Sequence, residues 1–188
     1  MTSWEELKLQ CLHCDRCGLC AARTNVVFGV GNPNADILFV GEGPGEQEDL
    51  QGKPFVGPAG KLLDDMLSII DLTRDYNCYI ANIVKCRPPR NRDPEEEEQN
   101  ACIGYLRDQI SLIQPKIIVC LERIAAKKLI DPQFRITREH GNWYLKDGIW
   151  YMAIYHPSAL LRDLSKRPET FDDLLSLREK IEQIHAWH

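Results

Sequence analysis

The sequence predicts an α/β fold in which a mostly parallel sheet is covered by helices on both faces. Short apolar runs rich in Ile, Leu and Val alternate along the chain with longer segments whose apolar residues recur at helical spacing. This alternation is typical of consecutive βαβ units, whose helices cover both faces of a parallel sheet. A chain of 188 residues suits one full hydrophobic core, so we expect residues 1–188 to form a single domain.

The first half of the chain contains two expected strands. We expect, in order, a helix at 4–12, a strand at 36–40, a helix at 58–72 and a strand at 78–84. Three glycines and a proline at 41–45 end the first of these strands, because they favour a sharp change of direction. Taken alone, this turn is also compatible with an ordinary strand-to-helix loop.

The second half of the chain continues the alternation. We expect a helix at 94–113, a strand at 116–121, a short helix at 122–130, a hairpin at 143–155 and a final helix at 168–187. Asp93 and Pro94 are suited to be the N-cap and the first residue of the long helix. The acidic run at 95–98 suits its first turn, because negative charge there interacts favourably with the helix dipole.

Polar residues follow three of the expected strands. Glu42 comes after the first strand, Asn82 lies near the end of the second, and His156 follows the hairpin. Because open α/β sheets bind ligands beyond the carboxyl ends of their strands, we expect these three side chains to converge on one crevice. An acid, an amide and an imidazole in one crevice indicate an active site.

The charge and the hydropathy of the chain exclude some classes of protein. A net charge of −5 argues against a broadly basic nucleic-acid binder, but Lys85, Arg87, Arg90 and Arg92 cluster in one loop and allow a local basic groove. The N-terminal segment is acidic and unlike a secretory signal, and no apolar stretch approaches the roughly 20 residues of a membrane span. We therefore expect a cytoplasmic protein without a membrane partner.

Eight cysteines are many for a cytoplasmic protein, where disulfides are rare, so metal binding is the better explanation. Cys14 and Cys17, separated by two residues, are a strong metal-binding pair. Cys86 follows a strand and Cys102 lies on the next helix, so these two can complete a four-thiolate site. Four thiolates fit either zinc or an iron–sulfur cluster.

The other cysteines leave alternatives open. Cys11 and Cys20 offer further registers of the same spacing. His13 can replace a thiolate at a zinc site, although a plain surface position is the simpler interpretation. Cys78 and Cys120 lie inside apolar strands, where we expect small buried side chains.

Three segments together carry a resemblance to a known family. They are GEGPGEQEDLQGKPFVGPAG at 41–60, NIVKCRPPRNRDP at 82–94 and HPSALLR at 156–162. In these segments the chain resembles the family 4 uracil-DNA glycosylases, which carry an iron–sulfur cluster. The resemblance implies a three-layer αβα sandwich with a central four-stranded, mostly parallel sheet. It also implies that a [4Fe–4S] cluster is bound by Cys14, Cys17, Cys86 and Cys102.

The resemblance further implies a monofunctional hydrolase that flips uracil out of DNA, cleaves the N-glycosidic bond and leaves an abasic site. The expected partner is uracil-containing DNA, single- or double-stranded, in the cytoplasm of a prokaryotic cell alongside the nucleoid. We expect a monomer, and no motif specifies a protein partner such as a sliding clamp. Within this resemblance Glu42 and Asn91 position the attacking water, and His156 donates to uracil O2 as negative charge develops there.

The residues that bind the base and the DNA are implied in the same way. Phe55 stacks on the flipped base, and Asn82 reads its edge. The main-chain amide of Gly43 contacts uracil, and Glu48 excludes the methyl group of thymine. The residues implied to bind DNA are Lys85, Arg87, Arg90, Ser158, Leu161 and Arg162, and the residue that fills the space of the flipped nucleotide is Leu160, Leu161 or Arg162.

Two other interpretations are compatible with the sequence. A DNA-binding or polymerase-associated relative of the same fold would bind uracil-containing DNA without releasing the base, but the presence of Glu42, Asn82 and His156 argues against it. A zinc-stabilised nucleotide-binding module would be colourless, whereas an iron–sulfur protein is brown. One departure from the family pattern is Glu122, at a strand end where relatives often have glycine.

Overall fold

The computed structural model describes residues 2–186, and within them one sheet has six strands in the order β1-β3-β2-β4-β6-β5. The four central strands are parallel to one another: β3 (Tyr79–Asn82), β2 (Ile37–Gly41), β4 (Ile117–Cys120) and β6 (Ile149–Ala153). The two edge strands, β1 (Val30–Gly31) and β5 (Tyr144–Lys146), are short and antiparallel to their neighbours. The expected four-stranded parallel centre is confirmed, and so is the expected hairpin, which is formed by β5 and β6. The edge strand β1 was not expected.

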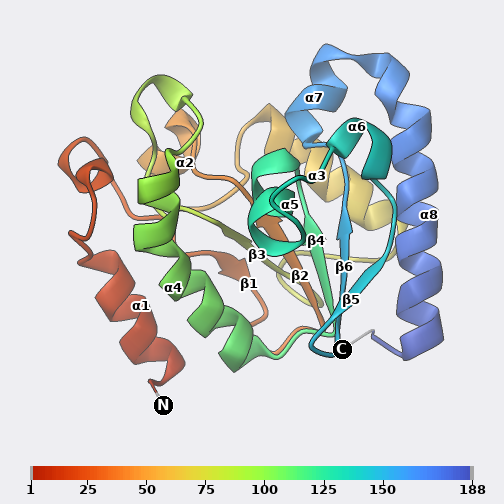
Figure 1. Ribbon diagram of the computed structural model, residues 1–188, viewed down its shortest axis with the longest axis horizontal. Coiled ribbons are helices and arrows are strands. Elements are labelled where there is room, and N and C mark those ends of the chain that lie inside the picture. Colours follow the sequence, from red (N-terminus) through yellow and green to blue (C-terminus); the bar gives the residue numbers. More distant parts are fainter. Residues whose placement is uncertain (1, 187–188) are drawn as a thin grey trace.

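Helices cover both faces of this sheet. The longer ones are α1 (Trp4–Leu12), α3 (Pro58–Ile69), α4 (Glu96–Ile113) and α8 (Arg167–Ile184). The shorter ones are α2 (Glu46–Gln51), α5 (Arg123–Leu129), α6 (Ile136–Glu139) and α7 (Pro157–Arg162), with 3-10 turns η1 (Gly18–Ala21), η2 (Pro89–Asn91) and η3 (Leu164–Lys166). Figure 1 shows α1 and α4 together on one side of the sheet and α8 on the other.

Two buried clusters hold these layers together. On one face of β2, Leu38 and Val40 belong to a cluster with Leu7 of α1 and Leu106 of α4. On the opposite face, Phe39 belongs to a cluster with residues of α3 and α8. Because both faces are buried, the central strands must be apolar at every position, which explains the continuous Ile, Leu and Val runs in the sequence.

The long helix α4 begins two residues later than the sequence indicates. Its N-cap is Glu95, and the Glu98 carboxylate accepts a hydrogen bond of 2.8 Å from the Glu95 main-chain N–H. The same carboxylate binds the Arg92 guanidinium at 2.7 and 2.9 Å. The prediction that Asp93 caps this helix is therefore wrong, because a capping box with an added ion pair stabilises the later start.

The other predicted boundaries differ by a few residues. Helix α3 ends at Ile69, earlier than the expected 72. Helix α8 ends at Ile184, where His185 adopts a left-handed φ of 55°, and residue 187 of the expected helix lies outside the described residues. No helix within residues 2–186 has the length and apolar character needed to cross a bilayer.

Candidate active site and cysteine centre

A cleft of about 470 Å³ lies beyond the carboxyl ends of the parallel strands, and its size suits a small-molecule ligand. Its lining includes every residue that the sequence proposes for catalysis and base binding: Glu42, Gly43, Glu48, Phe55, Asn82, Asn91 and His156. Ser158 and Arg162 also line it. These residues come from segments that lie far apart in the sequence, and the topology of the sheet brings them together.

Asn82 is the last residue of β3, and its side chain is buried in this cleft with 2% exposure. Its Oδ1 is the one buried side-chain nitrogen or oxygen in residues 2–186 without a hydrogen-bond partner. A Cβ at Gly41 would lie 2.6 Å from this oxygen and 2.7 Å from the Phe55 ring, so only glycine fits there. Leaving such an acceptor unpaired costs about 1–3 kcal/mol, which a ligand that donates a hydrogen bond would recover.

Phe55 is held beside Asn82 in a conformation that a phenylalanine rarely adopts. Its φ is 52°, in the left-handed region, and its ring stacks on the His156 ring with centroids 5.3 Å apart. The Arg74 guanidinium donates to the Phe55 carbonyl at 2.8 Å and to the Pro54 carbonyl at 2.9 Å. Arg74 therefore fixes the loop that carries Phe55. No local sequence signal indicates this contact, because Arg74 lies in the chain after helix α3.

Glu48 has a structural function that the sequence did not indicate. Its carboxylate accepts hydrogen bonds from the main-chain N–H groups of Gly45 at 3.0 Å, Val56 at 3.0 Å and Gly57 at 3.3 Å. One side chain thus joins the glycine turn to the loop that carries Phe55. This half-buried carboxylate with three main-chain donors is a strong tie, because hydrogen bonds to a carboxylate are stronger than those between neutral groups.

His156 is the N-cap of α7, and its Nδ1 accepts a hydrogen bond of 3.0 Å from the main-chain N–H of Ser158. The Ser158 hydroxyl lies 2.7 Å from the same nitrogen. Burial, with a smaller contribution from Arg162, lowers the pKa of His156 to about 4, so the ring is neutral at neutral pH. Because Nδ1 is an acceptor, the single ring proton is on Nε2, which is free to donate.

Glu42 lies directly after β2 and is an unusually weak acid. Burial, followed by the negative charge of Asp93, raises the pKa of Glu42 to about 7. The Arg123 guanidinium forms an ion pair with Asp93 and partly offsets this effect. The site therefore contains a carboxyl group whose pKa lies near neutral pH, which is typical of groups that move or orient protons.

Glu122 occupies the matching position at the end of β4. Its carboxylate caps α5 by accepting hydrogen bonds of 2.6 Å from the main-chain N–H groups of Ile124 and Ala125. Its backbone has φ 138° and ψ −178°, a conformation that is normally restricted to glycine. The backbone here thus keeps the shape that suits glycine, and the added side chain provides the cap.

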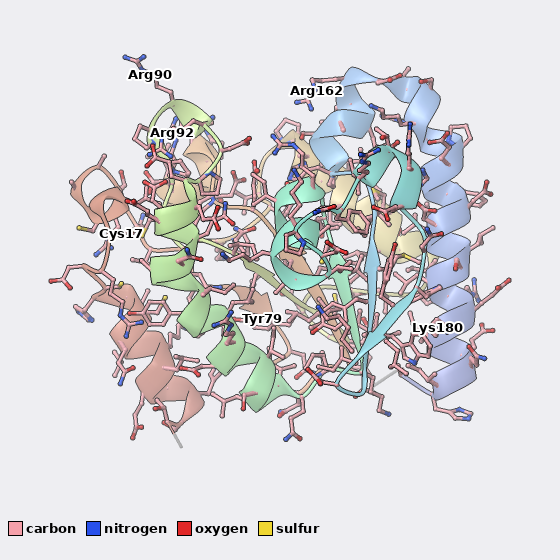
Figure 2. The ribbon with its side chains drawn as sticks, in the orientation of Figure 1. Cys17, Tyr79, Arg90, Arg92, Arg162 and Lys180 are labelled. Atoms are coloured by element: carbon pink, nitrogen blue, oxygen red, sulfur yellow. The ribbon has the colours of Figure 1, made fainter. Side chains whose placement is uncertain are left out.

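The basic loop between β3 and α4 lies at the rim of the cleft. Asn91 is exposed and has φ 59°, and its Oδ1 accepts a hydrogen bond of 2.7 Å from Arg87 Nε. Figure 2 shows Arg90, Arg92 and Arg162 at the end of the molecule where the parallel strands finish, with Arg90 projecting into solvent. Positive side chains therefore lie on both sides of the cleft.

Two of the residues considered for DNA contact are buried instead. Lys85 is 1% exposed, and its ammonium donates to the Asn82 carbonyl at 3.0 Å and to Gln109 Oε1 at 2.7 Å. The prediction that Lys85 binds a phosphate is therefore wrong, because its charge points into the core. Leu160 is 2% exposed and cannot enter a duplex, whereas Leu161 is 44% exposed.

Six cysteines line a second cavity, between the N-terminal segment, the loop after β3 and helix α4. They are the four proposed ligands Cys14, Cys17, Cys86 and Cys102, together with Cys11 and Cys20. In Figure 2, Cys17 lies on the segment that follows α1. The guanidinium of Arg23 donates to Cys86 Sγ at 3.5 Å and to the Cys14 carbonyl, so it joins the two halves of the cavity.

The six thiols of this cavity are a donor set that fits a thiolate-bound metal centre, either zinc or an iron–sulfur cluster. Within residues 2–186, no three His, Cys, Asp or Glu side chains are arranged to hold one metal ion. His13 is exposed, with Nδ1 3.0 Å from the Leu9 carbonyl, and lies outside the cavity lining, as expected.

Cys78 and Cys120 are apart from this cavity. Both side chains are fully buried, with 0% exposure. Cys120 is in β4, and Cys78 directly precedes β3. The prediction that they are small buried side chains is confirmed. The candidate metal ligands are therefore the six cysteines of the cavity.

Comparison with known proteins gives a consistent result. The family model of the uracil DNA glycosylase superfamily matches residues 28–177. The chain is 44% identical over 187 residues to the type-4 uracil-DNA glycosylase of Archaeoglobus fulgidus, covering 95% of this chain and 94% of that protein. It is 45% identical to the type-4 enzyme of Sulfurisphaera tokodaii, covering 95% of this chain and 85% of that protein. It is 47% identical to the type-4 enzyme of Thermotoga maritima, covering 81% and 80%.

These matches extend over nearly the whole chain and include the strand ends that form the cleft. The superfamily match begins before β2 and ends inside α8, so it covers the entire parallel centre of the sheet. The chain therefore belongs to the uracil DNA glycosylase superfamily and, within it, to the type-4 uracil-DNA glycosylases.

Proposed function

We propose that this protein removes uracil from DNA by hydrolysing the N-glycosidic bond, which releases free uracil and leaves an abasic site for base excision repair. The observation that carries the proposal is the unpartnered Oδ1 of Asn82, buried in a cleft of suitable size. An orphaned acceptor of this kind is costly unless a ligand satisfies it. Family membership supports the same reaction.

Asn82 recognises the base through both ends of its amide. Its Oδ1 accepts from uracil N3–H and its Nδ2 donates to uracil O4. Cytosine offers an acceptor at N3 and a donor at N4, so the same amide cannot pair with it in this orientation. Phe55 provides a flat apolar surface for the ring, and the main-chain N–H of Gly43 completes the contacts. Glu48 supports recognition by holding the Phe55 loop, and it limits the space at the C5 edge.

His156 and Glu42 act on the two charges that develop as the bond breaks. The departing uracil becomes negative, and the neutral His156 donates from Nε2 to its O2, as a donor in an oxyanion hole does. The sugar becomes positive, and ionised Glu42 stabilises it while orienting the attacking water. Asn91 shares in holding this water. A neutral histidine is suited to this task, because a hydrogen bond strengthens as charge appears on its acceptor.

Extrusion of the nucleotide from the duplex costs a few kcal/mol of stacking and pairing. Leu161 and Arg162, both exposed beside the cleft, fill the space it leaves. Arg87 and Arg90 on one rim and Ser158 on the other contact phosphates, which position the strand without reading its sequence. The substrate is uracil-containing DNA in the cytoplasm of a prokaryotic cell.

Cys14, Cys17, Cys86 and Cys102 would hold a [4Fe–4S] cluster in the cysteine cavity. The cluster would supply structural cross-linking, since hydrolysis of a glycosidic bond needs no electron transfer. The four cysteines belong to the N-terminal segment, the loop after β3 and helix α4. Their common binding would tie the basic loop at the rim of the cleft to the rest of the fold.

Replacing Cys86 with serine should remove the iron. We expect the iron content to fall from about four atoms per chain to well below that value, with loss of the brown colour and of solubility. The matched control is Cys120→Ala, which removes a thiol of β4 outside the cavity and should keep its iron. Iron analysis and visible absorption measure both variants, and full iron in Cys86→Ser would overturn the ligand assignment.

The pH dependence of base release should report on Glu42. Its pKa of about 7 means that it is protonated in acid and ionised in base, so kcat/KM should rise with pH through about 7. His156, with a pKa of about 4, stays neutral through this range and adds no limb. Glu42→Gln should release uracil slowly, at a rate that does not rise with pH in this range. Single-turnover rates over a pH series measure this dependence. If the rate of Glu42→Gln still rises through the same pH range, the rise belongs to another group.

The proposed function is tested with matched oligonucleotides that carry one uracil, one thymine or one cytosine. After incubation with the protein, alkali cleaves abasic sites, and we expect strand cleavage at uracil alone. Cleavage at none of them, with DNA still bound, would contradict the proposal and favour a non-catalytic relative of the same fold. Parallel measurement of free uracil distinguishes base release from direct strand cleavage.

A further inference from the structure

The buried ammonium of Lys85 lies between the two sites described above. On one side it donates to the main-chain carbonyl of Asn82, at 3.0 Å, whose side chain is in the base-binding cleft. On the other side Lys85 lines the cavity that contains Cys86 and Cys102. Neither the DNA contacts nor the catalytic steps proposed above involve this side chain. Its position therefore needs a separate explanation.

A second buried polar residue extends the contact across the fold. Gln109 of α4 is 0% exposed, and its Oε1 accepts from the Lys85 ammonium at 2.7 Å. Its Nε2 donates to the Phe28 carbonyl at 3.0 Å. The Lys85 carbonyl in turn accepts from the Val27 N–H at 2.7 Å. A continuous hydrogen-bonded chain thus joins the end of β3 to the helix that carries Cys102 and to the connector before β1.

Burial of the Lys85 ammonium is energetically unfavourable unless a negative charge lies nearby. The oxygen atoms that accept from the Lys85 ammonium belong to a carbonyl and an amide, both neutral. A fully buried ammonium with neutral partners costs several kcal/mol, and an apolar side chain of equal length would avoid this cost. Lys85 lines the cavity that contains six cysteines, and thiolates bound to a metal there would supply such a charge. The position of Lys85 therefore suits a counter-charge in the cysteine cavity.

We propose that Lys85 is a positioning residue that couples the metal-bound cysteine centre to base recognition. Its ammonium balances the negative charge of the thiolate-bound cluster, and its hydrogen bond to the Asn82 carbonyl fixes the backbone from which the Asn82 amide reaches uracil. The cysteine centre thereby acts on the base pocket through one side chain and not only by holding the rim loop. This inference rests on the proposed function.

The test compares Lys85→Met with Lys53→Met. Methionine matches the length of lysine without its charge, and Lys53 is an exposed lysine on the Phe55 loop. We expect Lys85→Met to keep its iron, to bind free uracil at least ten times more weakly by calorimetry, and to show a more negative reduction potential of the cluster, because a positive neighbour is lost. Lys53→Met should match the unchanged protein in all three.

Unchanged uracil affinity and unchanged potential in iron-loaded Lys85→Met would overturn the proposal, because Lys85 would then only fill space. If Lys85→Met does not fold, Gln109→Leu keeps the ammonium and removes one of its partners. That variant should weaken uracil binding with its iron intact, and unchanged binding there would also overturn the proposal. Failure of the proposed function is recognised separately, since the unchanged protein would then release no base although its cluster potential still responds to Lys85.

Discussion

Replacing Asn82 with alanine is expected to lower kcat/KM for uracil release by about 10²–10³-fold. Two hydrogen bonds to the base disappear, and in a site shielded from water each contributes about 1.5–2 kcal/mol, which together correspond to this loss. The thermal stability should hold, because Oδ1 of Asn82 has no partner within the described chain whose loss would matter. Single-turnover rates on a uracil oligonucleotide, with melting curves of the same samples, measure both effects.

Asn77→Ala is the matched control for this variant. Asn77 is also buried, but its amide accepts from the Thr73 N–H at 2.8 Å and donates to the Asp71 carbonyl at 3.0 Å. This variant should lose stability and keep its activity per folded molecule. If Asn82→Ala released uracil at the unchanged rate, Asn82 would have no part in base recognition, and the orphaned oxygen would need another ligand.

Replacing His156 with alanine is expected to lower kcat by about 10²–10³-fold, the usual effect of removing one donor to a developing anion. The loss should fall on kcat more than on KM, because the hydrogen bond from Nε2 strengthens only as uracil O2 becomes negative. Rates at saturating and at limiting DNA separate the two constants. Iron content should not change, since His156 lies in the cleft and not in the cysteine cavity.

His13→Ala provides the control for removal of a histidine. His13 is exposed at the end of α1, outside both cavities, and its removal should change neither rate nor iron content. A His156→Ala protein that releases uracil at the unchanged rate would exclude the imidazole as the electrophile. A loss that fell equally on base release and on DNA affinity would point to a binding role for His156 in place of a transition-state role.

The alternating pattern of the sequence determined the layers and the location of the candidate active site. Short continuous apolar runs bounded by turn residues are typical of strands buried on both faces. Helical periods between them indicate crossover helices, and together these patterns predict a parallel sheet. Once the strands are parallel, their carboxyl ends meet at one edge. The sequence alone therefore assigns Glu42, Asn82 and His156 to one crevice. The spacing of Cys14 and Cys17 is a similar local signal, and both line the cavity proposed to hold the metal.

Tertiary structure alone decided what surrounds these side chains. Lys85 follows a strand in a basic loop and looks like a phosphate contact, but Gln109 and Phe28, both distant in the sequence, enclose it. Glu48 and Arg74 fix the Phe55 loop through main-chain groups that no residue pattern encodes. A periodic pattern reveals which face of an element is apolar. The burial of a polar residue at the end of an element depends on partners that only the folded chain brings to it.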